Sequence, residues 1–84
     1  MKNKVLIQLI VPDIGEEYNV YIPVNKKIGN IIVLLTKAIN EFESEIYESD
    51  NQNCLYNGDT GERYAINDLV RNTNIRNGTK LVLM

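Results

Sequence analysis

The sequence predicts an α+β domain in which one helix packs across one face of a mixed sheet of four to five strands. Three patterns predict this fold class: an apolar run at 5–11 followed by an alternating run at 18–22, a helical repeat from Ile28 to Phe42, and an apolar run at 79–84. A period of two is typical of strands, and spacings of three and four are typical of an amphipathic helix. Because the 84 residues suit one small core, we expect a single domain over residues 1–84.

The first two strands are expected to form an antiparallel hairpin. Residues 5–11 are β-branched and apolar, and Pro12-Asp13-Ile14-Gly15 then breaks the run with turn residues. If the amide of Gln8 faces water, the odd-numbered residues of this strand point to the core, and Leu6 and Ile10 lie on the outer face. In the second strand, the alternation places the side chains of residues 18, 20 and 22 on one face, and Pro23 ends the strand.

The helix is predicted to begin near Ile28. Its apolar stripe comprises Ile28, Ile31, Ile32, Leu35, Ala38, Ile39, Phe42 and Ile46, and Asn30, Val33, Lys37 and Asn40 project to the opposite side. The helix is expected to fade between Glu43 and Ile46, because acidic side chains gather there at the negative end of the helix dipole.

A short strand at 54–56 and a last strand at 79–84 complete the predicted sheet. Asn57-Gly58 predicts a tight turn after the short strand, and residues 62–65 are expected to pair briefly beyond it. Residues 66–70 indicate a turn or a single helical turn. Because the first and last strands are both strongly apolar, we expect them to lie parallel at the centre, in the order second, first, last, third.

The composition excludes several classes of function. The chain has no histidine and one cysteine, Cys54, which excludes a disulfide within the chain, a four-cysteine zinc site and an iron–sulfur cluster. Nine basic and eleven acidic residues give a net charge of −2, without the concentrated positive charge that nucleic-acid binding needs. No apolar run approaches the roughly 18 residues of a membrane span. We therefore expect a cytoplasmic protein with no catalytic residue, cofactor, metal, nucleic-acid partner, direct membrane insertion or small-molecule substrate.

Two further features have a plain structural interpretation. The acidic residues from Glu41 to Asp50 are expected to be a solvated charge run, with docking to a basic partner as the alternative. Cys54 has no histidine to activate it as a nucleophile, and we expect it to be a small core residue.

The order of the elements resembles the β-grasp fold of ubiquitin over almost the whole chain. Ile28 in the helix, Asn57-Gly58 after the third strand, and Ile75 ahead of Leu81 and Leu83 reproduce that core pattern. Two segments narrow the resemblance: residues 22–39 (IPVNKKIGNIIVLLTKAI) and residues 67–83 (NDLVRNTNIRNGTKLVL). They are similar to the YukD/EsaB family, small ubiquitin-like proteins of type VII secretion systems in low-GC Gram-positive bacteria. Residues 41–63 resemble this family least.

The resemblance implies a noncatalytic protein-interaction module, an accessory or regulatory component of type VII secretion that docks reversibly to other components. The membrane components of the secretion systems in which this family occurs include a transporter with a cytosolic ubiquitin-like domain. The alternative is a ubiquitin-like modifier or a sulfur or acyl carrier, which needs a flexible Gly-Gly tail as its acyl group. We expect neither of these, because the sequence has no such tail and its last strand runs to Met84.

The β-grasp register predicts a binding surface on the outer face of the sheet, the face that ubiquitin uses for recognition. The candidate protein-binding residues are Leu6, Ile10, Leu55, Val82 and Met84. The alternative is that they are scattered surface residues or are covered by the loop before Cys54. At 54–56, three consecutive apolar residues leave open which side chain points inward.

Overall fold

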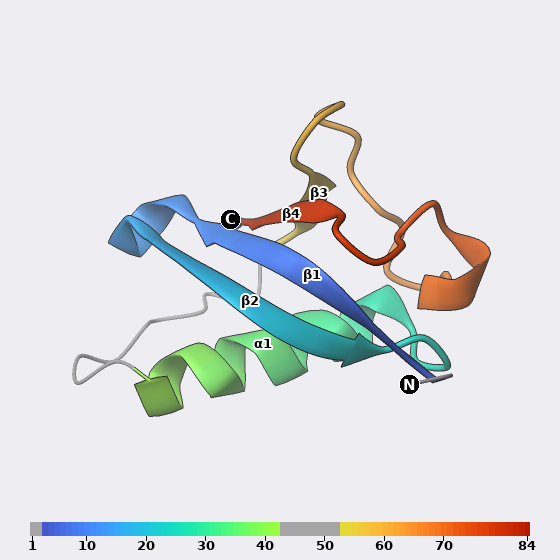
Figure 1. Cartoon of the computed structure of the whole chain (residues 1–84), viewed down its shortest axis with the longest axis horizontal. Coiled ribbons are helices and arrows are strands. Elements are labelled where there is room, and N and C mark those ends of the chain that lie inside the picture. The colour runs from blue at the N-terminus through green and yellow to red at the C-terminus, as the bar shows by residue number, and fades with distance from the viewer. Residues whose placement is uncertain (1–2, 43–52) are drawn as a thin grey trace.

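The structure is a computed structural model that describes residues 3–42 and 53–84, which form one mixed four-stranded sheet with a helix against it (Figure 1). Its elements are β1 (Lys4–Val11), β2 (Glu16–Pro23), α1 (Ile28–Phe42), β3 (Leu55–Asn57) and β4 (Lys80–Leu83), with short 3-10 helices at Pro12–Ile14 and Val70–Asn72. The strand order is β2-β1-β4-β3; β1 runs parallel to β4, and the other neighbours are antiparallel. The predicted fold class and strand order are confirmed.

The opening hairpin follows the predicted alternation. Ile7, Leu9 and Val11 are buried, and the residues opposite Ile7 and Leu9 on β2 point to the same inner face. Gly15 closes the turn between the strands with a φ of 65°, a left-handed conformation that glycine adopts without steric cost. Its backbone N–H donates a hydrogen bond to the carbonyl of Pro12.

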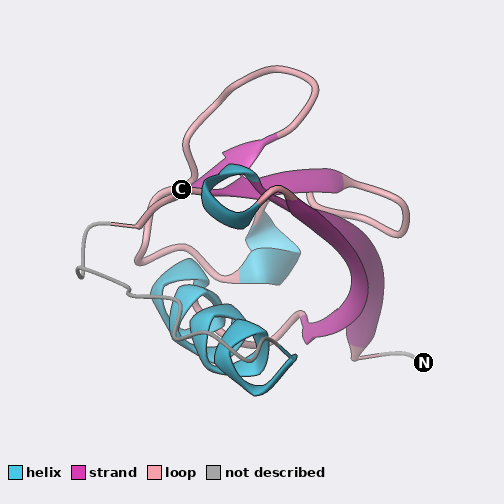
Figure 2. Ribbon diagram, turned by 90° about the vertical axis from the view of Figure 1, so that its left-hand side faces the viewer, coloured by secondary structure: helices cyan, strands magenta, loops and turns pink. Residues whose placement is uncertain are grey.

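Helix α1 packs its buried residues, from Ile28 to Ile39, against the inner face of the sheet, which curves over one side of the helix (Figure 2). The predicted burial of Phe42 on this stripe is wrong, because its side chain is 60% exposed. The loop at 66–68 completes the first turn of α1: the N–H groups of Ile28 and Gly29 donate to the carbonyls of Asp68 and Ile66, both at 2.9 Å. These bonds satisfy donors that have no partner within a helix. The predicted helix end between Glu43 and Ile46, and the acidic run beyond Phe42, lie outside the described residues.

One core holds the helix, the sheet and the chain between β3 and β4 together. Its buried apolar residues are Ile7, Leu9, Val11, Ile22, Ile28, Ile31, Ile32, Leu35, Ile39, Leu55, Tyr64, Val70, Ile75, Leu81 and Leu83. The turn predicted at 66–70 is confirmed: residues 66 and 67 form a turn, closed by a hydrogen bond from the N–H of Asp68 to the carbonyl of Ala65, and the 3-10 helix follows from Val70. Within the described ranges, no helix is long and apolar enough to cross a membrane.

A buried hydrogen-bond network fixes the turn after β3. The Asn57 side-chain carbonyl accepts from the N–H groups of Asp59 and Thr60 at 2.8 and 2.9 Å. Its amide donates to the Tyr64 hydroxyl at 3.0 Å, which in turn donates to the Asn74 side-chain carbonyl at 2.6 Å. Asn57 is a buried polar residue in this core, and these bonds replace the water that its amide loses on folding.

We predict that Leu35→Ala and Leu81→Ala each lower the free energy of unfolding by about 2–5 kcal/mol, because each truncation leaves a cavity in the core. Chemical denaturation followed by circular dichroism measures the loss. Val33→Ala on the exposed side of α1 is the matched control, and it should change stability by less than about 0.5 kcal/mol. Losses below about 1 kcal/mol at both core sites would contradict the burial of Leu35 and Leu81 in the core between α1 and the sheet.

We predict that Tyr64→Phe lowers stability by about 1–3 kcal/mol, because it leaves the buried Asn57 amide without its acceptor. The substitution keeps the ring, so the change in stability reports the hydroxyl alone. The control is Tyr21→Phe, which removes a hydroxyl from an exposed side chain on β2. Equal stability of the two variants in thermal or urea denaturation would show that the network contributes nothing.

Candidate functional site

The face of the sheet opposite α1 carries most of the predicted binding residues. Leu6 and Ile10 point there because they alternate with the buried residues of β1. Leu6 is 37% exposed and Met84 is 50% exposed. Ile10 and Val82 are half-buried, so each retains surface that a partner can cover. The predicted outer-face placement of Leu6, Ile10 and Val82 therefore agrees with the strand alternation.

Strand register joins residues from both halves of the chain into one line across this face. Ile10 is opposite Glu17 on β2 and opposite Val82 on β4, and Val82 is opposite Tyr56 on β3. A further bridge joins Tyr56 to Arg63. We call these five residues, Glu17, Ile10, Val82, Tyr56 and Arg63, the outer row. It has a half-buried apolar centre between an acidic end and a basic end.

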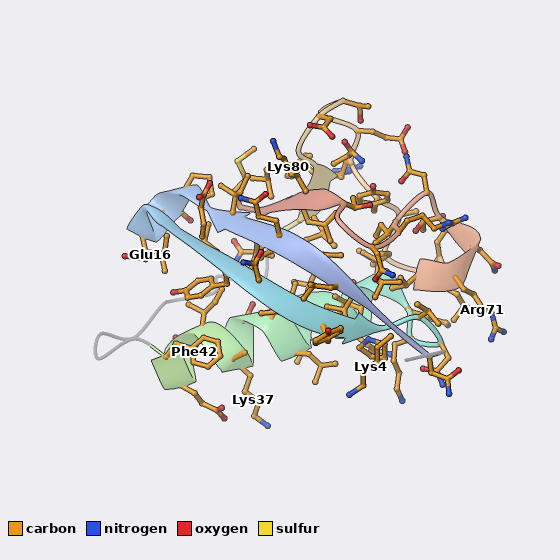
Figure 3. The ribbon with its side chains drawn as sticks, viewed as in Figure 1. Lys4, Glu16, Lys37, Phe42, Arg71 and Lys80 are labelled. Carbon is orange, nitrogen blue, oxygen red and sulfur yellow. The ribbon has the colours of Figure 1, made fainter. Side chains whose placement is uncertain are left out.

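Polar residues separate Leu6 from the outer row. Gln8 lies between Leu6 and Ile10 on β1 and is opposite Lys80 on β4. Figure 3 shows Lys80 on the side of the sheet away from α1. The pairing partner of Leu6 is the exposed Tyr21 on β2. Leu6 and Tyr21 therefore form a second apolar spot on the same face, and the five predicted residues do not form one continuous patch.

Met84 lies beside the outer row. It extends the pairing of β4 by one residue, because the backbones of Met84 and Cys54 exchange hydrogen bonds of 2.8 and 3.2 Å. Since Met84 follows Val82 by two residues, the alternation of the strand places both side chains on the outer face. The outer row and Met84 together are the candidate docking surface.

The predicted outer-face placement of Leu55 is wrong. Leu55 is 0% exposed and belongs to the core. Its partner on β4 is Leu83, which is also buried, and residues directly opposite each other in a sheet share a face. The outward side chain of β3 is Tyr56, which was not predicted. The signal that identifies Tyr56 is its pairing with Val82 rather than its local sequence.

The described residues outside the candidate docking surface include Cys54 and a pocket that it lines. No group of three or more His, Cys, Asp or Glu side chains in this part of the chain could hold a metal ion. Cys54 is half-buried rather than a fully buried core residue. It lines a pocket of about 370 Å³ with Arg63, Tyr64 and Ile66, among others. Every buried side-chain polar atom of the described residues has a hydrogen-bond partner.

Comparison with known proteins relates this geometry to solved structures. No protein-family model matches the chain, and no curated protein matches it. The EccD5 ubiquitin-like domain from Mycobacterium xenopi is similar, with 18% identity, 96% of this chain and 92% of that chain covered, and a TM-score of 0.77. A chain of the MycP5-free ESX-5 inner membrane complex is similar at 12% identity, with a TM-score of 0.72. The match covers 98% of this chain but only 21% of the chain from that complex.

The same fold also occurs in a different kind of assembly. A chain of the toluene 4 monooxygenase HD complex with the inhibitor 4-bromobenzoate has a TM-score of 0.79 and 4% identity, with 95% of each chain covered. At such identities, a structural likeness establishes the fold alone. The sheet order, the single helix across one face and these neighbours show that the chain has the ubiquitin-like β-grasp fold.

Proposed function

We propose that this chain is a noncatalytic ubiquitin-like interaction module that serves a bacterial type VII secretion system as an accessory or regulatory component. It would act in the cytoplasm by reversible docking to protein components of that apparatus. The observation that carries the proposal is the outer row, which gathers apolar and aromatic side chains from three strands onto one face of the sheet. The loop before Cys54, the alternative cover for this face, lies outside the described residues.

The make-up of the outer row supports a docking role. Protein interfaces commonly have an apolar centre and a polar rim, and aromatic residues and arginine contribute strongly to their affinity. Ile10, Val82 and Tyr56 supply such a centre, and Glu17 and Arg63 supply charged ends of opposite sign. The opposite charges favour one orientation of a partner along the row.

Two independent lines support the secretion context. The structural neighbours include the EccD5 ubiquitin-like domain of a type VII system and a chain of an ESX-5 inner membrane complex. In addition, as stated under Sequence analysis, residues 22–39 and 67–83 resemble the YukD/EsaB family of the same secretion systems. Both lines favour protein partners within the secretion apparatus.

We predict that Ile10→Lys and Val82→Glu each weaken capture of type VII secretion components at least tenfold, which corresponds to about 1.4 kcal/mol. Each variant places an unpaired charge in the centre of the contact. In the Ile10→Lys variant, the new lysine is opposite Glu17, and this opposite-charge pair favours the folded state of the variant. The measurement is affinity purification of the tagged protein from detergent-solubilised host cells, with the secretion components quantified by mass spectrometry.

The matched control is Val33→Glu, which introduces the same charge on the exposed side of α1, away from the outer face. Circular dichroism confirms that each variant is folded. Ile10→Lys and Val82→Glu introduce opposite charges. If both variants lose binding, the cause is burial of the outer row in the contact rather than the partner's preference for one sign of charge. The proposal fails if the folded variants capture secretion components as well as the wild type, or if the wild type captures none of them.

A further inference from the structure

Among the residues that the structure describes, strand β2 is a long open edge of the sheet. It stands at one end of the strand order, and β1 is its one neighbouring strand in that sheet. The N–H of Val24 donates to the carbonyl of Asn3, and hydrogen-bonded pairs alternate along an antiparallel ladder. In this register, the backbone groups of Tyr18, Val20 and Ile22 bond to β1. The N–H and C=O groups of Glu17, Asn19 and Tyr21 therefore point to the open edge.

This edge lacks the usual protection against strand pairing. Exposed edges are commonly blunted by lysine, proline, bulges or short length. Residues 18–22 contain no charge, proline or glycine, and Pro23 stands only at the end of the strand. The opposite edge differs, because β3 has only 3 residues and Tyr56 is bridged to Arg63. Strand β2 is thus the edge that is suited to accept another strand.

An exposed apolar ridge of α1 runs beside the open edge. Leu34, Ala38 and Phe42 are four residues apart and so lie along one side of the helix. Leu34 is 48% exposed and Phe42 is 60% exposed. The Phe42 ring lies 5.6 Å from the ring of Tyr18, centroid to centroid, which places this side of α1 next to β2. A strand added to the edge would cover part of the ridge.

The charges at the two ends of β2 have opposite signs. Glu16 and Glu17 begin the strand, whereas Lys26 and Lys27 follow its end, and Lys4 is opposite Pro23. Figure 3 shows Glu16 and Lys4 at opposite ends of the hairpin. Two copies of β2 in antiparallel orientation bring the acidic start of each copy toward the basic end of the other. The edge is therefore complementary to itself.

We propose that β2 pairs antiparallel with β2 of a second copy of this chain, with the two Asn19 residues opposite each other. This register pairs Glu17 of each copy with Tyr21 of the other and uses every outward N–H group of residues 17–21. It also keeps Pro23, which has no N–H to donate, outside the pairing. A two-fold axis relates the copies, as in most symmetric dimers.

Pairing at this edge joins the two sheets into one and turns both outer rows to the same side. The dimer then offers two docking surfaces to one partner complex, which raises the effective concentration of the second surface once the first is bound. Because a strand edge buries less area than a standard interface, we expect weak association, with a Kd on the order of 100 µM.

Sedimentation equilibrium of the full chain, from about 10 µM to 1 mM, tests the proposal. We expect a concentration-dependent rise toward the mass of two 9.6 kDa chains. Asn19→Pro removes the central outward N–H and spares the bonds to β1, so it should weaken association at least tenfold. Asn19→Ala keeps that N–H and should associate like the wild type. Circular dichroism of dilute samples confirms the fold of both variants.

Amide hydrogen exchange by NMR locates the contact. The amides of Glu17, Asn19 and Tyr21 should exchange fast in dilute protein and become protected in concentrated protein. Those of Tyr18, Val20 and Ile22 should be protected at both concentrations. A chain that stays monomeric up to about 1 mM overturns the proposal. So does a dimer in which the three outward amides stay unprotected, because another surface then forms the contact.

Charge reversal tests the orientation. The variant E16K/E17K and the variant K26E/K27E should each associate more weakly than the wild type, because like charges then meet at both ends of the pair. An equimolar mixture of the two variants should recover association, since each end again joins opposite charges. Failure of the mixture to associate more strongly than either variant alone would rule out the antiparallel arrangement.

Discussion

The parallel pairing of β1 with β4 is the constraint on which the rest of the structure depends. It brings residues near the two ends of the chain together at the centre of the sheet, where Leu9 is opposite Leu81 and both are buried. Parallel neighbours cannot be joined by a tight turn, so the intervening chain must cross the sheet. That crossover supplies α1, whose buried residues cover the inner face, so that α1 lies on the side of the sheet away from the outer row. Both the core and the candidate docking surface follow from this one pairing.

The long elements could be predicted from the sequence because their periodicity and their burial agree. The apolar repeat that starts at Ile28 has the period of a helix, and the structure buries that repeat from Ile28 to Ile39 but leaves Phe42 60% exposed. The short β3 could not be predicted in the same way. Three consecutive apolar residues at 54–56 leave open which side chain points inward, and Asn57 is expected in the turn after the strand. The structure buries both Leu55 and Asn57, and Tyr64 together with the turn N–H groups satisfies the amide of Asn57.

The candidate site was predictable only where one strand by itself fixes the direction of its side chains. Ile10 and Val82 alternate with buried residues of their own strands, so their outward placement follows from sequence alone. The outward placement of Tyr56 depends on the register between strands that are distant in the chain. The separation of Leu6 from Ile10 by Gln8 and Lys80 depends on such a register as well. A register shift of one residue moves every side chain of a strand to the opposite face of the sheet, and nothing local to residues 54–56 fixes that register.

Strand β2 connects the docking surface and the self-pairing edge through the same residues. The side chain of Glu17 ends the outer row, and its backbone groups point to the open edge. In the paired register, Glu17 stands opposite Tyr21 of the second copy, so the outer row continues onto that copy. A partner that contacts both side chains binds the pair more tightly than it binds one chain. Such coupling is reciprocal. Pairing of the two copies raises their affinity for the partner, and the partner raises the affinity of the copies for each other by the same factor.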